Sequence, residues 1–276
     1  MSENTKAYMS SSSLVLGLSP VLLSTLGPSI SEIGLLSLNR PGLSVMLSLG
    51  TVAVYPSRAL AYNADSCRDI LEQTTALPVF VFNALRQRRR LASIVSVAEY
   101  VIVALAVFNV FYTSWQLGVA TLLNFICQSS FMPIIWTSLP LLIHLPAALA
   151  FRFNLMGAGE MPQSWKVARS RLISETKLCM MHKPIPTSIF KASPVVLACH
   201  WMATLFGFVH VILGILIYSS LLFTMTTDAA VVLLRYFASA LTCRFVLMFE
   251  LSGIKWAQNG AAPVSAQSEY LHLEEF

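Results

Sequence analysis

Long runs of apolar residues alternate with short basic or polar segments along the chain. Four of these runs, at residues 94–117, 131–151, 194–223 and 229–251, are about as long as a membrane-crossing helix. The hydrocarbon core of a bilayer is about 30 Å thick, so a helix that rises 1.5 Å per residue needs roughly 20 apolar residues to cross it. The pattern therefore predicts four transmembrane helices.

The first 60 residues contain shorter apolar pieces. Gly27 and Pro28 interrupt the apolar residues 13–38, and a turn signal follows at residues 39–42. Apolar pieces of about 10 to 14 residues are more typical of re-entrant or half-helical segments than of complete spans. The sequence predicts a hairpin, with a broken helix at 13–38 and a shorter helix at 43–60. This hairpin either spans the membrane twice or re-enters it.

Composition supports a lipid environment. Hydrophobic residues make up 56% of the chain and charged residues only 11%, with a mean hydropathy of +0.69. A soluble domain carries about 25% charged residues, so an ordinary soluble protein, a disordered chain and a disulfide-rich secreted module are all excluded. The predicted fold class is all-α: a polytopic membrane helical bundle with six transmembrane segments when the hairpin is counted as two.

Basic residues gather in two loops that share one side of the membrane if the four spans alternate in direction, whereas the other side carries Arg40 and two short turns. Lysine and arginine are enriched in cytosolic loops, so this side is predicted to be cytosolic, with both termini on it. The membrane is that of the endoplasmic reticulum or the plasma membrane. The predicted segments are a cytosolic N-terminus (1–12), the hairpin (13–60), a basic loop (61–93), a transmembrane pair (94–151), a second basic loop (152–193), a second transmembrane pair (194–252) and a mobile cytosolic tail (253–276).

The basic loops predict contact with the membrane surface. An arginine-rich run immediately before a span is typical of a stop-transfer signal that also binds anionic lipid headgroups. The second loop has near-helical apolar spacing around Trp165, which predicts a helix in the headgroup layer or, equally, a solvated connector. Nucleic acid is not expected as a partner, because the net charge of +5 is confined to loops between spans. The predicted surface residues are Arg86, Arg88, Arg89, Arg90, Lys166, Arg169 and Arg171.

Four ionisable residues share a depth within the predicted spans. Counted from the basic side, Glu99, His144, His200 and Arg244 each lie about 12 to 14 Å inside, on four different helices. A charged residue at the centre of a span costs about 2.5 to 3.5 kcal/mol, so we expect a polar layer with Glu99 and Arg244 as an ion pair. The layer is either an internal site that binds an anion or moves a proton, or a packing device.

Three more polar residues lie within apolar runs. Glu32 follows the helix break and either closes a polar cavity or begins a helix. Arg235 is expected to contact Asp228 or lipid phosphate, and His210 to pack against neighbouring helices. The five cysteines show no CxxC spacing, and metal-binding, phosphate-loop and hydrolase motifs are missing, so no metal or cofactor is expected.

Two segments, residues 26–58 and 234–255, resemble multi-pass membrane proteins of filamentous fungi that have no assigned activity. The resemblance implies a fungal source and an endomembrane or plasma-membrane address, and it carries over no catalytic residue.

The preferred interpretation is a non-enzymatic multi-pass protein with a transport-like, scaffold or lipid-interacting role. One alternative is an intramembrane enzyme for a lipid or prenyl-type substrate, with Glu99 and His144 or His200 as acid and base and Arg244 holding an anion. A second alternative is a subunit of a larger membrane complex or a homo-oligomer, because some spans are rich in small residues.

Overall fold

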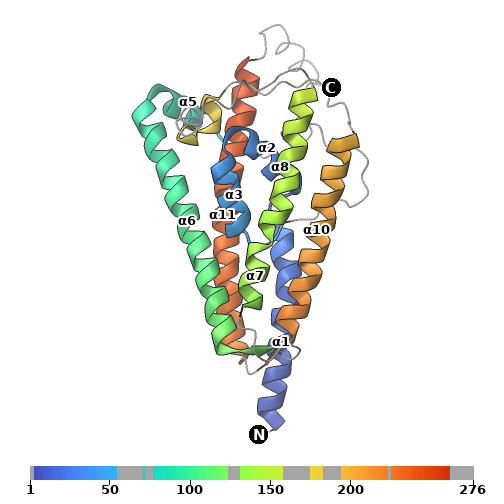
Figure 1. Ribbon diagram of the computed structural model, residues 1–276. Coiled ribbons are helices and arrows are strands. Elements are labelled where there is room, and N and C mark those ends of the chain that lie inside the picture. The colour runs from blue at the N-terminus through green and yellow to red at the C-terminus, as the bar shows by residue number, and fades with distance from the viewer. Residues whose placement is uncertain are drawn as a thin grey trace, which may run out of the picture.

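Four long apolar units form the frame of the molecule. The computed structural model describes residues 3–54, 71, 77–123, 131–157, 175–182, 194–222 and 225–261. Within them, α6 (Arg89–Ala120), the consecutive α7 (Met132–Ser138) and α8 (Pro140–Gly157), α10 (Pro194–Ser219) and α11 (Thr226–Ala261) run along the long axis of the molecule (Figure 1). All four units are long and apolar enough to cross a membrane. The predicted all-α membrane bundle is confirmed.

The N-terminal region consists of three helices, α1 (Glu3–Leu26), α2 (Ile30–Asn39) and α3 (Pro41–Gly50). The chain breaks between α1 and α2 because Gly27 and Pro28 interrupt the helix and Ser29 then caps α2. The Ser29 hydroxyl accepts a hydrogen bond from the Glu32 amide at 3.2 Å, and the Glu32 carboxylate accepts one from the Ser29 amide at 2.7 Å. This reciprocal pair is a capping box, which satisfies two free donors at the helix start.

The helix α3 turns back from α2 and ends inside the bundle. It has only 10 residues, about 15 Å of helix, and residues 51–54 after it are buried. Gly27 lies against this segment, where a Cβ atom would overlap the Ala53 carbonyl oxygen. The predicted shorter helix at 43–60 therefore ends at Gly50 in the structure, and residues 55–60 lie outside the described residues.

The described ends of the chain lie at opposite ends of the bundle. In Figure 1, α1 begins at the bottom and leads upward to α2, whereas α11 ends at the top. The helices α1 and α2 together follow the length of the bundle once, and α3 returns only part of the way. The cytosolic position of both termini stays a prediction. The helix α11 also continues to Ala261, past residue 253, where the tail was predicted to begin.

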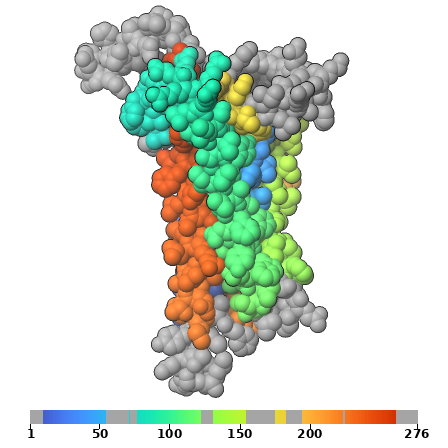
Figure 2. Space-filling model, turned by 90° about the vertical axis from the view of Figure 1, so that its left-hand side faces the viewer, coloured from blue at the N-terminus to red at the C-terminus, as the bar shows by residue number. Residues whose placement is uncertain are grey.

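Shorter elements close the two ends of the bundle. At the bottom, β1 (Leu122–Leu123) and β2 (Leu221–Leu222) form a short antiparallel pair. At the top, α5 (Val79–Gln87) and the short helix η2 (Cys179–Met181) lie beside the end of α11. Figure 2 shows α6 and α11 side by side on one face, with α5 above them. Most of the second basic loop, including Trp165, Lys166, Arg169 and Arg171, lies outside the described residues.

The outward faces of the long helices are apolar, as a lipid-facing surface requires. On α6, exposed apolar side chains extend from Ile94 to Val119, and on α10 from Val195 to Leu216. The interior combines leucine-rich clusters with buried serine and threonine hydroxyls. Several of these hydroxyls donate to backbone carbonyls three or four residues earlier in their own helix, and the Ser114 hydroxyl also lies 2.9 Å from the Tyr236 hydroxyl on α11.

Candidate functional site

A buried arginine is the centre of the most polar region inside the bundle. Arg40 occupies the turn between α2 and α3, and its side chain is 0% exposed. It reaches this position because Pro41 begins α3 immediately after it, so the turn projects the side chain between the helices. A guanidinium group is costly to bury unless its donors are paired, so its contacts define the site.

Two carboxylates from different helices contact the Arg40 guanidinium. One terminal nitrogen (Nη1) donates to Glu99 Oε2 on α6 at 2.5 Å and to Glu250 Oε1 on α11 at 2.7 Å. The other (Nη2) donates to the Ser96 hydroxyl at 2.7 Å. The guanidinium carbon also lies 5.1 Å from the centre of the Tyr100 ring. We call these residues the arginine centre: Arg40, Ser96, Glu99, Tyr100 and Glu250.

The segment 175–182 is attached to the arginine centre by several hydrogen bonds. The Glu175 carboxylate accepts from the Gly42 amide at 2.9 Å and from the Tyr100 hydroxyl at 2.6 Å, and the Glu175 carbonyl accepts from Arg40 Nε at 3.2 Å. Further along, the Cys179 amide donates to Glu250 Oε2 at 2.9 Å. The arginine centre therefore connects the α2–α3 turn, two long helices and this connecting segment.

The predicted ion pair between Glu99 and Arg244 is wrong. Arg244 instead donates to Glu32 Oε2 at 2.5 Å, at the break between α1 and α2, and both of these side chains are partly exposed. Arg40 takes the place expected for Arg244 beside Glu99. The expectation that Arg40 lies on the side opposite the basic loops also fails, because its guanidinium contacts Glu175 in the second of those loops.

Only Glu99 of the arginine centre was identified from the sequence, and the two other charged members, Arg40 and Glu250, were missed. Arg40 was assigned to a turn outside the membrane, and Glu250 lies at the last residues of a predicted span. One signal was available: Arg40 and Glu250 are isolated charges flanked by apolar helices, as Glu99 is. Charges of opposite sign in such positions are candidates for pairing.

The three histidines that lie within predicted spans occupy separate environments. His144 on α8 lies 3.4 Å from the Ser44 hydroxyl, whereas His200 lies on α10, where its carbonyl accepts from Thr204. His210 stacks on Trp136 at 4.9 Å, and each of these two residues hydrogen-bonds to the backbone carbonyl of the other. The hydrogen bonds of Glu99 go to Arg40 and not to a histidine.

Arg235, in the lower half of α11, serves as a link between two helices. Its Nη1 donates to Gln116 Oε1 on α6 at 2.8 Å, and its carbonyl accepts from Asn109 at 3.0 Å. The sequence interpretation offered Asp228 or lipid phosphate as the partner, so the Gln116 contact was not foreseen. Asn109 also donates to Ser239 at 2.8 Å, which adds a second link between α6 and α11.

A basic pocket of about 630 Å³ lies at the same end of the molecule as the arginine centre. It lies between the α5–α6 junction, the segment 175–182 and the end of α11, and the Arg86 guanidinium lies 5.5 Å from the centre of the Trp256 ring. Its described lining contains three cationic side chains and no carboxylate. The lining includes Arg86, Arg89, Lys177, His182 and Trp256.

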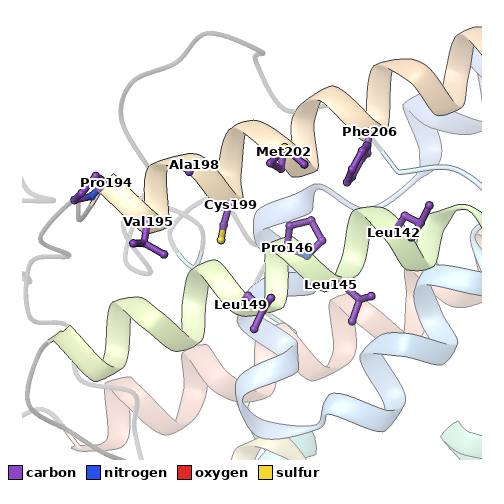
Figure 3. Close-up of a pocket in the computed structure, with 10 residues that line it drawn as sticks. All are labelled: Leu142, Leu145, Pro146, Leu149, Pro194, Val195, Ala198, Cys199, Met202 and Phe206. Atoms are coloured by element: carbon purple, nitrogen blue, oxygen red, sulfur yellow. The ribbon is translucent and has the colours of Figure 1, made fainter.

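An apolar groove of about 550 Å³ lies between α8 and α10 (Figure 3). Its walls include Leu145 and Pro146 from one helix and Cys199 and Met202 from the other. All of its lining side chains are apolar or weakly polar, so it offers no group that could hold a charged substrate. Its position between two membrane-crossing helices suits contact with lipid chains.

The described residues contain no group of three or more histidine, cysteine or acidic side chains that could hold a metal ion. The Cys179 thiol, outside the spanning helices, is fully buried, and burial raises its pKa. A protonated thiol is a poor nucleophile. Comparison with known protein families, curated proteins and solved structures gives no match. The resemblance to fungal membrane proteins therefore stays a prediction.

Proposed function

We propose that this chain is a non-enzymatic multi-pass membrane protein that binds phosphate-bearing lipid headgroups in its basic pocket. The observation that supports this function is the convergence of Arg86, Arg89 and Lys177 on one pocket whose described lining lacks any carboxylate. Arginine and lysine are the usual partners of phosphate, and the ring of Trp256 is typical of residues at a membrane interface.

The lengths of the helices support a position of the pocket at headgroup level. The helix α6 has 32 residues and α11 has 36, which correspond to about 48 and 54 Å. A hydrocarbon core of about 30 Å leaves their ends in the headgroup layers, which extend the bilayer to about 40 to 45 Å. The pocket lies beside the first turn of α6 and the last turns of α11, so its cations meet lipid phosphates.

The orientation and address belong to this proposal as well. The end of the bundle with the basic pocket faces the cytosol, because positively charged loops stay on that side during insertion. The first residues of α1 then lie on the opposite side, in an endoplasmic reticulum or plasma membrane. Anionic lipids of the cytosolic leaflet would supply the ligand.

The intramembrane-enzyme alternative is less well supported. It requires Glu99 with His144 or His200 as acid and base and Arg244 as the anion holder. In the described residues, Glu99 is bound to Arg40 and Arg244 to Glu32. General acid–base catalysis needs the two groups within hydrogen-bond reach of one substrate, and these contacts direct them elsewhere.

Lipid binding to the delipidated protein tests the proposal, with native mass spectrometry as the measurement. We expect phosphatidic acid to bind more tightly than phosphatidylcholine, and the triple variant R86A/R89A/K177A to lose about tenfold or more of that affinity. Each basic residue near an anionic surface contributes about 1 kcal/mol, and tenfold corresponds to about 1.4 kcal/mol.

The matched control is Arg90→Ala, which removes a charge from the same arginine run but not from the pocket lining. Thermal unfolding of both variants checks that the bundle is intact. Equal affinity of wild type and triple variant for phosphatidic acid, with both folded, would refute the proposal.

A further inference from the structure

The charges of the arginine centre do not balance if every group is ionised. One guanidinium, that of Arg40, faces two carboxyl groups, Glu99 and Glu250, and all three side chains are at least nine-tenths buried. Two buried carboxylates would leave a net negative charge in a region that water does not reach. An uncompensated buried charge costs several kcal/mol, so the protein gains stability by neutralising it.

The two carboxyl groups have one hydrogen-bond donor in common, the Arg40 Nη1 group. Glu99 Oε2 and Glu250 Oε1 accept from the same Arg40 nitrogen, so the two nitrogen–oxygen distances limit the separation of these oxygens to about 5 Å. When two carboxylates share a site, the like charges favour protonation of one of them.

One oxygen of this pair has no hydrogen-bond partner. Glu99 Oε1 is buried and unpartnered among the described residues, whereas both oxygens of Glu250 accept hydrogen bonds, one from Arg40 and one from the Cys179 amide. A fully ionised carboxylate would expose a bare negative oxygen to an apolar interior. A protonated Glu99 carries less charge on that oxygen.

The other titratable groups around the centre do not supply a second cation. On α6, Tyr100 donates its hydroxyl to Glu175; on the segment 175–182, Glu175 adds a further negative charge and Cys179 a thiol. On α8, His144 is directed to Ser44 on α3. Among the described residues, Arg40 is the cation in contact with the two carboxyl groups.

We propose that Glu99 and Glu250 form a proton-binding site and together hold one proton at neutral pH, so that Arg40 faces a single negative charge. The proton dissociates reversibly, and its loss leaves two carboxylates on one guanidinium. Because Glu250 also holds the Cys179 amide, loss of the proton disturbs the segment 175–182 first. This inference is independent of the lipid proposal, since it rests on the arginine centre alone.

Infrared spectroscopy of the purified wild-type protein in lipid nanodiscs tests the site. A protonated carboxyl group absorbs in the carbonyl-stretch region above the amide bands, and the band shifts in heavy water. We expect a carboxylic-acid band equivalent to one group per chain at neutral pH. Absence of any such band in the wild-type spectrum overturns the proposal, whatever the variants do.

Two single variants assign the band. In Glu99→Gln and in Glu250→Gln, the one remaining carboxyl group pairs with Arg40 and is ionised. Each variant should therefore lose the carboxylic-acid band. The matched control Glu32→Gln alters the carboxyl group on Arg244 and should keep the band. A wild-type band that persists in both folded variants would belong to another residue and would overturn the proposal.

Discussion

Removing the charge of Arg40 is the sharpest test of the architecture. The variant Arg40→Met replaces arginine with a long apolar side chain, which leaves Glu99 and Glu250 without their shared cation. Breaking a buried ion pair by removing one partner costs about 3–5 kcal/mol, because the other charge stays buried and unpaired. We expect the free energy of unfolding to fall by about that amount.

The assay is reversible unfolding of the purified protein in mixed micelles of mild detergent and sodium dodecyl sulfate. The size of the loss in unfolding free energy distinguishes a buried ion pair from a partly exposed one in the same molecule. The pair of Arg244 and Glu32 is 31% and 16% exposed, so Arg244→Met should cost about 1 kcal/mol or less. The difference in unfolding free energy between Arg40→Met and Arg244→Met therefore measures the effect of burying Arg40.

A triple variant distinguishes the cost of burying an unpaired charge from the cost of altered packing around residue 40. In R40M/E99Q/E250Q, no charged group remains in the arginine centre, and replacement of a whole buried ion network by neutral groups is often close to neutral in stability. We expect this triple variant to recover most of the loss. An Arg40→Met variant within about 1 kcal/mol of wild type would refute the reasoning, as would a triple variant no more stable than the single one.

Two further predictions concern close packing and the buried thiol. Gly27→Ala should lower the free energy of unfolding by about 1–3 kcal/mol, because the added Cβ atom would overlap the Ala53 carbonyl oxygen. The control Gly260→Ala adds a Cβ atom in open space, so it should leave the free energy of unfolding unchanged or raise it slightly in the same assay. Cys179 should react slowly with a water-soluble maleimide in the folded protein, since burial raises the pKa of its thiol. Glu175→Ala should speed this modification, measured by mass spectrometry of the peptide that contains Cys179, because Glu175 helps to attach the segment 175–182 to the arginine centre. Equal rates of modification in wild type and variant would contradict that attachment.

The sequence allowed the spanning helices to be predicted because hydropathy and length are local properties. Every long apolar run became one long helix or, in the case of α7 and α8, two consecutive helices, and the break at Gly27 and Pro28 separates α1 from α2. The end of α3 at Gly50 was not predictable in the same way. The apolar run continues to residue 55, and the helix ends where residues 51–54 pack beside Gly27, which is a tertiary contact.

The ion-pair partners of the buried charges could not be predicted from the depth of each residue in the membrane alone. Glu99 and Arg244 lie at similar depths on adjacent helices, but the rotation of each helix directs them to different neighbours, Arg40 and Glu32. Counting residues from the membrane edge gives no rotation, because each residue turns the helix by about 100°. Both arginines therefore pair with acidic residues, but the identity of each pair depends on the three-dimensional packing.

The separation of the ionic partners along the chain has a consequence for biogenesis. Arg40 is 59 residues from Glu99 and 210 residues from Glu250. A ribosome that adds about 5–20 residues per second makes Glu250 roughly 10–40 seconds after Arg40. Glu99 is made within the first third of that interval, so one of the two carboxyl partners of Arg40 exists well before the other. The full set of contacts around Arg40 therefore forms only after α11 has been translated.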